Sequence, residues 1–261
     1  MSLADKLVSS FLAFELDIDI QSPVHAKRTK ALKEFEKLGF PSKKDEAWKY
    51  TSLKSVIKED FTIFSKKKNV LDFKNVKNYF LDNTETYKIV FVDGFFDPFL
   101  SQTSHDGIDI CIMSAALTKT KYSKIINKFF NKSANPEDSL TSLNTAFSKE
   151  GVYIHIPKNT VLDKPVEIIH FATGNEAALI LQPRNLVVVE ENSELEIIES
   201  HQSLTVNPIF TNSVTEIFAL RNSKVDYYKI QNDVITSSLV DNTYVSQKRN
   251  SEVKVHTFSF G

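Results

Sequence analysis

The chain has 261 residues, of which 41% are hydrophobic and 25% are charged, and its formal net charge is −1. This composition suits a buried core in one large domain or two smaller ones. A charge near zero gives no general attraction to nucleic acid or anionic membranes, so neither is expected as a partner. The single cysteine, Cys111, excludes an internal disulfide framework and a four-thiolate metal site. No apolar run suits a secretion signal or a membrane span, and we expect a cytoplasmic protein.

Two amphipathic helices are predicted near the N-terminus. In the first, apolar residues recur at helical spacing over residues 3–12, after Ser2 as a capping residue. The second is expected to begin at Ser22-Pro23 and to end at Gly39, which readily adopts a left-handed conformation.

The segment that follows reads as mixed helix and strand. Residues 42–45 resemble the start of a third helix, with acidic residues where the helix dipole favours them. Asp93-Gly94 between two apolar runs is a strong hairpin signal. The elements expected beyond the third helix are a hairpin over 87–96, a strand over 109–113, a helix over 119–132 and a helix opening at Asn135 and ending before Gly151.

Short turns of Asn followed by Ser or Thr recur through the second half of the chain. They are Asn159-Thr160, Asn192-Ser193, Asn222-Ser223 and Asn250-Ser251, at spacings of 33, 30 and 28 residues. Each leads into a segment with the alternating hydrophobicity of a strand. Such a period indicates units that bury their apolar faces by stacking on one another, as in a β-solenoid. The sequence therefore predicts an α+β N-terminal domain over 1–150 and an all-β solenoid domain over 151–261.

The turn repeats also predict which side chains face the core of the solenoid. Adjacent positions of a strand face opposite sides, and the turns set the register of each coil. The inward residues are expected to be Leu195, Ile197, Val225, Tyr227, Val253 and Val255, and the outward residues Glu194, Glu196 and Lys224.

The histidines of the second half raise the question of a metal site shared between coils. They are His155, His170, His201 and His256, at spacings of 15, 31 and 55 residues. These spacings match no metal-ligand motif, and no cysteine or tight carboxylate cluster accompanies them in the sequence. We therefore expect ordinary histidines at all four positions.

The remaining polar groups also have simple interpretations. The acidic patch between Glu190 and Glu199 is expected to be solvated, as are the lysines at 66–68 and along 121–132. Cys111 lies in an apolar setting and is expected to be a buried structural thiol. No nucleophile elbow, phosphate-binding glycine loop or zinc motif is present. No catalytic, cofactor-binding or metal-binding residue is therefore predicted.

Several segments, taken in order, resemble the SufB/SufD family of iron-sulfur cluster assembly scaffolds, and SufD more closely. They are Pro41–Leu53, Phe91–Gly94, Leu100-Ser101, Leu143–Phe147, Gly151, Ile154–Pro157, Pro165–Ile168, Arg184-Asn185, Glu199–His201 and Ile230-Gln231. The resemblance implies an N-terminal helical domain, a right-handed parallel β-helix and a C-terminal helical segment. It also implies that SufD pairs with SufB through their β-helices, and that each binds the ATPase SufC through its C-terminal region.

The resemblance implies a non-catalytic, SufD-like scaffold subunit of the SUF machinery, in which the iron-sulfur cluster belongs to the full complex. The sequence stops at residues 256–261, inside a strand pattern, so we expect the family's C-terminal part to be missing. Because the family's cluster ligands and SufC-docking surface belong to that part, no ligand is assigned to this chain. The coil over 244–260 is expected to be exposed and to fray or self-associate. A carbohydrate-active β-helix enzyme and a stand-alone interaction solenoid are the alternatives.

Overall fold

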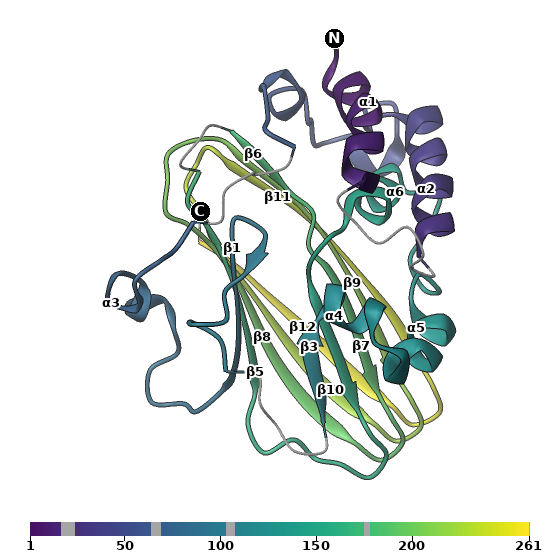
Figure 1. Cartoon of the computed structure of the whole chain (residues 1–261). Helices are drawn as coiled ribbons and strands as arrows, with labels where there is room; N and C mark the ends of the chain where they lie inside the picture. The colour runs from purple at the N-terminus through teal and green to yellow at the C-terminus, as the bar shows by residue number, and fades with distance from the viewer. Residues whose placement is uncertain (17–23, 64–68, 103–107, 175–177, 261) are drawn as a thin grey trace.

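The structure, a computed structural model, describes residues 1–16, 24–63, 69–102, 108–174 and 178–260. A helical N-terminal region is followed by a parallel-strand β-solenoid of about three turns, which confirms the predicted fold class. Helices α1, α2 and α6 lie together on one side of the strand stack, and α3 lies on the other side, beyond β1 (Figure 1). Within the described residues, no helix is both long enough and apolar enough to span a bilayer.

The first two helices form largely as the sequence predicts. α1 covers Leu3–Leu16, and Ser2 and Asp5 cap it by accepting hydrogen bonds from each other's backbone N–H groups, both at 3.1 Å. α2 covers His25–Leu38 and ends at Gly39, which has a φ of 68° and donates its N–H to a carbonyl of the last turn. The predicted start at Ser22 lies outside the described residues.

The prediction of a third helix is wrong. In its place are two short 3₁₀ turns, η1 over Glu46–Trp48 and η2 over Val56–Lys58. The Asp45 carboxylate accepts the Ser42 N–H at 2.7 Å, and the Asp45 N–H bonds the Ser42 carbonyl at 2.9 Å. These local bonds close a turn that competes with helix propagation.

The middle of the chain contains the predicted hairpin, strand and helices. Asp93 and Gly94 have φ values of 50° and 80° at the hairpin turn, as the Asp-Gly signal requires. The helix predicted over 119–132 covers only residues 120–129, because Lys119 and Phe130 are extended. The elements are α3 Phe73–Val76, η3 Lys77–Tyr79, β1 Tyr87–Val92, β2 Phe95–Phe96, β3 Asp109–Ile112, α4 Met113–Thr118, η4 Thr120–Tyr122, α5 Ser123–Phe129 and α6 Ser139–Phe147.

Two sheets make up the solenoid. One has the order β12-β10-β8-β5-β1-β2, and the other has the order β11-β9-β7-β4-β3, with β6 also paired to β9. β1 and β3 precede Gly151 in the sequence, yet they belong to these sheets. The domain boundary between residues 150 and 151 stays a prediction. The remaining strands are β4 Val152–Ile156, β5 Val166–Ala172, β6 Leu179–Leu181, β7 Arg184–Val189, β8 Glu194–Ser203, β9 Ile209–Ala219, β10 Lys224–Asn232, β11 Ser237–Gln247 and β12 Glu252–Ser259.

The coil register agrees with the prediction from the turns. Val225 pairs with Leu195 on one side and Val253 on the other, and the first two are almost fully buried. Glu196 and Lys224, the neighbours that alternate with the core positions, are exposed. In the last coil, β12 is largely exposed, as expected for residues 244–260.

The four turn asparagines form a ladder along one edge of the solenoid. All have positive φ, between 58° and 61°, a conformation that asparagine adopts more easily than most residues. The side-chain amides of Asn192, Asn222 and Asn250 each donate to the side-chain oxygen of the preceding turn asparagine, at 2.8, 2.8 and 3.2 Å. The turn residues thus bend the chain and also connect successive coils.

Candidate functional site

Parallel strands of neighbouring coils place three aromatic rings in a row. The register of β1, β5 and β8 aligns Phe91 with His170 and His170 with His201. The ring centroids of His170 and His201 are 4.6 Å apart, with an interplanar angle of 8°. Phe91 stacks on the other side of His170, at 5.1 Å. The spacing of 31 residues between the two histidines is therefore one coil of the solenoid.

The Glu199 carboxylate lies beside these imidazoles. Its Oε1 atom is 2.8 Å from His170 Nε2 and 3.9 Å from His201 Nε2, so only the first distance is that of a hydrogen bond. Asn185 Nδ2 donates to Glu199 Oε1 at 3.1 Å, and the Tyr227 hydroxyl donates to Oε2. Side chains from β5, β7 and β10 thus hold one carboxylate of β8.

Burial and hydrogen bonding determine the charge of this group. The side chains of His170, Glu199 and His201 are each less than a tenth exposed. Burial alone raises the pKa of Glu199, but the hydrogen bonds from His170 and the Tyr227 hydroxyl lower it overall, below its ordinary value. Burial lowers the pKa of His201 to about 3, so this imidazole is neutral at physiological pH.

The group faces two cavities in the solenoid. Glu199 and His201 line a cavity of about 270 Å³, together with Lys229 and Asp241, which form an ion pair. His170 lines a second cavity of about 100 Å³, where burial raises the pKa of Glu150 to about 7. Side chains of this polar cluster therefore line both cavities.

Two imidazoles and a carboxylate form a recognised set of metal donors. In the described part of the chain, His170, Glu199 and His201 offer ligand atoms that all lie within 4.8 Å of one another. Zinc and non-haem iron commonly take two histidines and one carboxylate. The same groups can exchange a proton, because Glu199 and His170 share a hydrogen bond.

Sequence spacing alone did not reveal this cluster. The interpretation of the acidic patch as solvated is wrong for Glu199, which is 1% exposed and shares a hydrogen bond with His170. Glu199 and His201 lie two residues apart on β8, whereas His170 comes from the preceding coil, so a local motif search does not find all three. The usable signal is that the histidine spacing of 31 residues falls within the coil period of 28 to 33 residues.

The other sequence-level candidates lie apart from this cluster. His155 is paired with Asp109 and Glu190, and His256 is exposed and stacks on Tyr228. Cys111 is half-buried, and burial raises the pKa of its thiol. The lysines over 121–132 are exposed, as predicted, whereas residues 66–68 lie outside the described residues.

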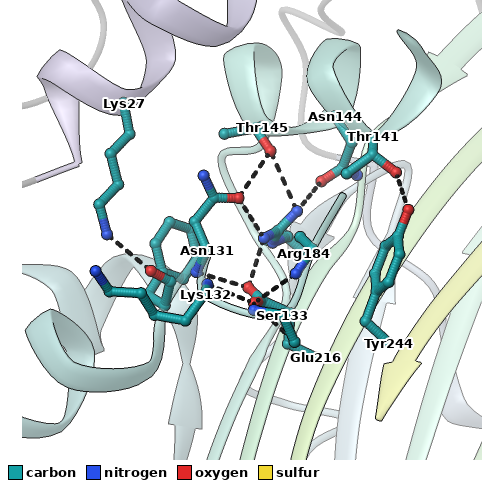
Figure 2. A network of polar contacts seen from close by, with 12 residues as sticks. Lys27, Asn131, Lys132, Ser133, Thr141, Asn144, Thr145, Arg184, Glu216 and Tyr244 are labelled. Atoms are coloured by element: carbon teal, nitrogen blue, oxygen red, sulfur yellow. Dashed lines mark hydrogen bonds and ion pairs between the residues drawn. The ribbon is translucent and has the colours of Figure 1, made fainter. Parts of the chain in front are cut away.

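A second buried polar network joins the N-terminal region to the solenoid (Figure 2). Arg184 of β7 and Glu216 of β9 form an ion pair, and Glu216 also accepts the backbone N–H groups of residues 131–134 at 2.7 to 3.2 Å. Lys27 of α2 donates to the Phe130 carbonyl at 2.7 Å. The hydrogen-bonding groups of this network all belong to the chain itself. We therefore assign the network a role in stabilising the fold.

Comparison with known proteins places nearly the whole chain in one family. A model described as the SufBD protein N-terminal region matches residues 6–168, and one described as the SUF system FeS cluster assembly, SufBD core domain, matches residues 170–261. The iron-sulfur cluster assembly SufBD family protein slr0076 of Synechocystis is 27% identical over 280 residues, covering 99% of this chain and 61% of that protein.

Two further proteins are similar to this chain. The iron-sulfur cluster assembly protein SufD of Bacillus subtilis is 29% identical over 133 residues, covering 49% of this chain and 29% of that protein. The chloroplastic protein ABCI7 of Arabidopsis thaliana is 24% identical over 237 residues, covering 85% of this chain and 47% of that protein. The chain spans less than two thirds of the length of each of these relatives. It belongs to the SufBD family of iron-sulfur cluster assembly proteins.

Proposed function

We propose that this chain acts as a SufD-like, non-catalytic scaffold subunit of the SUF iron-sulfur cluster assembly machinery. The observation that carries the proposal is the match of the N-terminal and core family models, in order, over nearly the whole chain. The similarity to a protein named SufD supports the choice of that subunit type. A rigid stack of coils suits a scaffold, because it holds partners and reactive groups in fixed positions.

The proposed partners are a SufB-like subunit and a SufC-like ATPase, and the proposed location is the cytoplasm. Family membership supports the SUF machinery as the setting. A carbohydrate-active enzyme, the first alternative from the sequence, has no support from the family assignment. A stand-alone interaction solenoid is the remaining alternative, and it predicts a protein without SUF partners.

An anaerobic pull-down tests this proposal. The tagged gene product is expressed together with SufB-like and SufC-like proteins, and the retained proteins are quantified. We expect the SufB-like subunit to be retained in stoichiometric amounts, whereas direct retention of the SufC-like ATPase is not expected, because its docking surface is placed in the family's C-terminal part. Lys224→Asp provides a folded surface control, because Lys224 is exposed on the outer face of β10. Recovery of the tagged protein alone would favour the stand-alone solenoid.

A further inference from the structure

We propose that His170, Glu199 and His201 bind one divalent first-row transition-metal ion inside the solenoid. Only the identity of the physiological metal, which we take to be Fe²⁺, rests on the proposed function. It replaces the expectation from sequence that no residue of the chain is a metal ligand.

The donor atoms are already close to the spacing that a metal requires. An ion bound about 2.1 Å from each ligand in a tetrahedral arrangement holds its donor atoms about 3.4 Å apart. Glu199 Oε1 lies 2.8 Å from His170 Nε2 and 3.9 Å from His201 Nε2, so small side-chain movements bring the three into position. Because the two imidazoles are stacked in parallel, their rings must tilt toward each other to bind the same ion.

The surroundings keep these groups ready to bind a cation. His201 Nε2 lies 3.9 Å from Glu199 Oε1, which is too long for a hydrogen bond, so Glu199 does not occupy this nitrogen. Asn185 and Tyr227 donate hydrogen bonds to the Glu199 carboxylate and orient it, as outer partners of metal ligands usually do. A metal bound at His170 Nε2 takes the place of the proton that this nitrogen donates to Glu199.

The cavity and the donor types indicate which metal species fits. Glu199 and His201 line the cavity of about 270 Å³, which has room for water molecules to complete the coordination shell. The group contains no thiolate, whereas protein-bound iron-sulfur clusters are held mainly by cysteines. Nitrogen donors also favour transition metals over Mg²⁺ and Ca²⁺, which prefer oxygen. The site thus fits a single iron or zinc ion.

Metal titration under anaerobic conditions tests the site. Fe²⁺, Zn²⁺ and Co²⁺ are titrated into the metal-free protein in competition with a chromophoric chelator, with Mg²⁺ as the negative control. Wild type and His256→Gln, which alters an exposed histidine of the same sheet, are expected to bind one ion. His201→Gln is expected to bind at least about 100-fold more weakly. Equal affinity of the two variants, or no binding by the wild type, would overturn the proposal.

Spectroscopy of the wild type provides a test that does not depend on how the variants fold. X-ray absorption of the Zn²⁺-bound and Co²⁺-bound protein is expected to show two imidazole ligands and only oxygen or nitrogen donors. A sulfur ligand would indicate Cys111 and contradict the proposed site. Fe²⁺ usually binds to a protein site more weakly than Zn²⁺. A difference in affinity larger than this usual one would contradict the choice of iron.

The outcomes separate this inference from the proposed function. Partner retention without metal binding would reject the metal site and keep the scaffold role. Metal binding without partner retention would keep the site and reject the scaffold role.

Discussion

Arg184 and Glu216 form an ion pair with no solvent-exposed side-chain surface, and their Nη2 and Oε2 atoms are 2.6 Å apart. The two residues lie on neighbouring strands, β7 and β9, of one sheet. Glu216 continues the contact into residues 131–134, and Arg184 reaches Asn144 and Thr145 of α6. The pair therefore holds the helical region against the solenoid.

Glu216→Gln should strongly destabilise the protein. It leaves the Arg184 guanidinium buried without its counter-charge, and loss of one partner of a buried pair costs about 3 to 5 kcal/mol. Urea unfolding measures the change. The control is Glu194→Gln, which removes the partner of Lys224 in a solvent-exposed pair and should cost at most about 1 kcal/mol. Equal losses in the two variants would mean that the buried pair does not hold the two regions together.

A charge placed at a core position of the solenoid should have a much larger effect than one placed beside it. Val225 is 1% exposed and pairs with core residues of both neighbouring coils, so Val225→Asp buries an unpaired carboxylate and should unfold the solenoid. Lys224→Asp changes an exposed residue and should cost less than about 1 kcal/mol. Circular dichroism and thermal melting distinguish the two. Similar melting temperatures would show that the register is wrong.

The stacked coils could be predicted because their signals are local and repeated. Each asparagine turn specifies a positive φ, and the alternation that follows specifies the face of each strand, so Leu195 and Val225 could be placed in the core. The third helix could not, because the short-range bonds between Ser42 and Asp45 outweigh a helical pattern.

The candidate site depends on how separate coils align. His170 meets His201 only because β5 and β8 pair in one register, and a shift of one residue would turn a side chain to the other face. Glu199 reaches the imidazoles through contacts with Asn185 and Tyr227, which lie on two further strands. No sequence interval encodes such a convergence directly. Comparing the histidine spacing with the coil period recovers the stacked pair, and strand alternation then places Glu199 on the same face of β8 as His201.

Asn192 has two roles that substitution can separate. Its φ of 59° favours Gly or Asn, and its side chain bonds both Asn159 and Asn222. Asn192→Gly keeps the backbone conformation and loses only the ladder, so it should cost about 1 kcal/mol. Asn192→Ala also strains the turn and should cost about 1 kcal/mol more. Unfolding free energies from urea titration give the comparison, and equal costs would show that the backbone conformation contributes nothing.

The stability of the solenoid should fall with acidification because His201 is buried and neutral. Its pKa is about 3 in the folded protein, against an ordinary value of 6.5. Between these values the unfolded chain binds a proton that the folded chain does not, so the unfolding free energy decreases as the pH falls. For His201 alone, lowering the pH from about 7 to about 5 removes about 2 kcal/mol. The lowered pKa of Glu199 acts in the same direction at lower pH.

His201→Gln should remove this part of the pH dependence. Urea unfolding at several pH values, with a chelator present to exclude metal, should give a shallower loss of stability for the variant than for the wild type. The raised pKa of Glu150 favours the folded state as the pH falls, but it is common to both proteins and cancels in the difference. His256→Gln alters an exposed histidine and should keep the wild-type slope. If His201→Gln also kept that slope, the pKa of His201 would not be lowered in the folded protein.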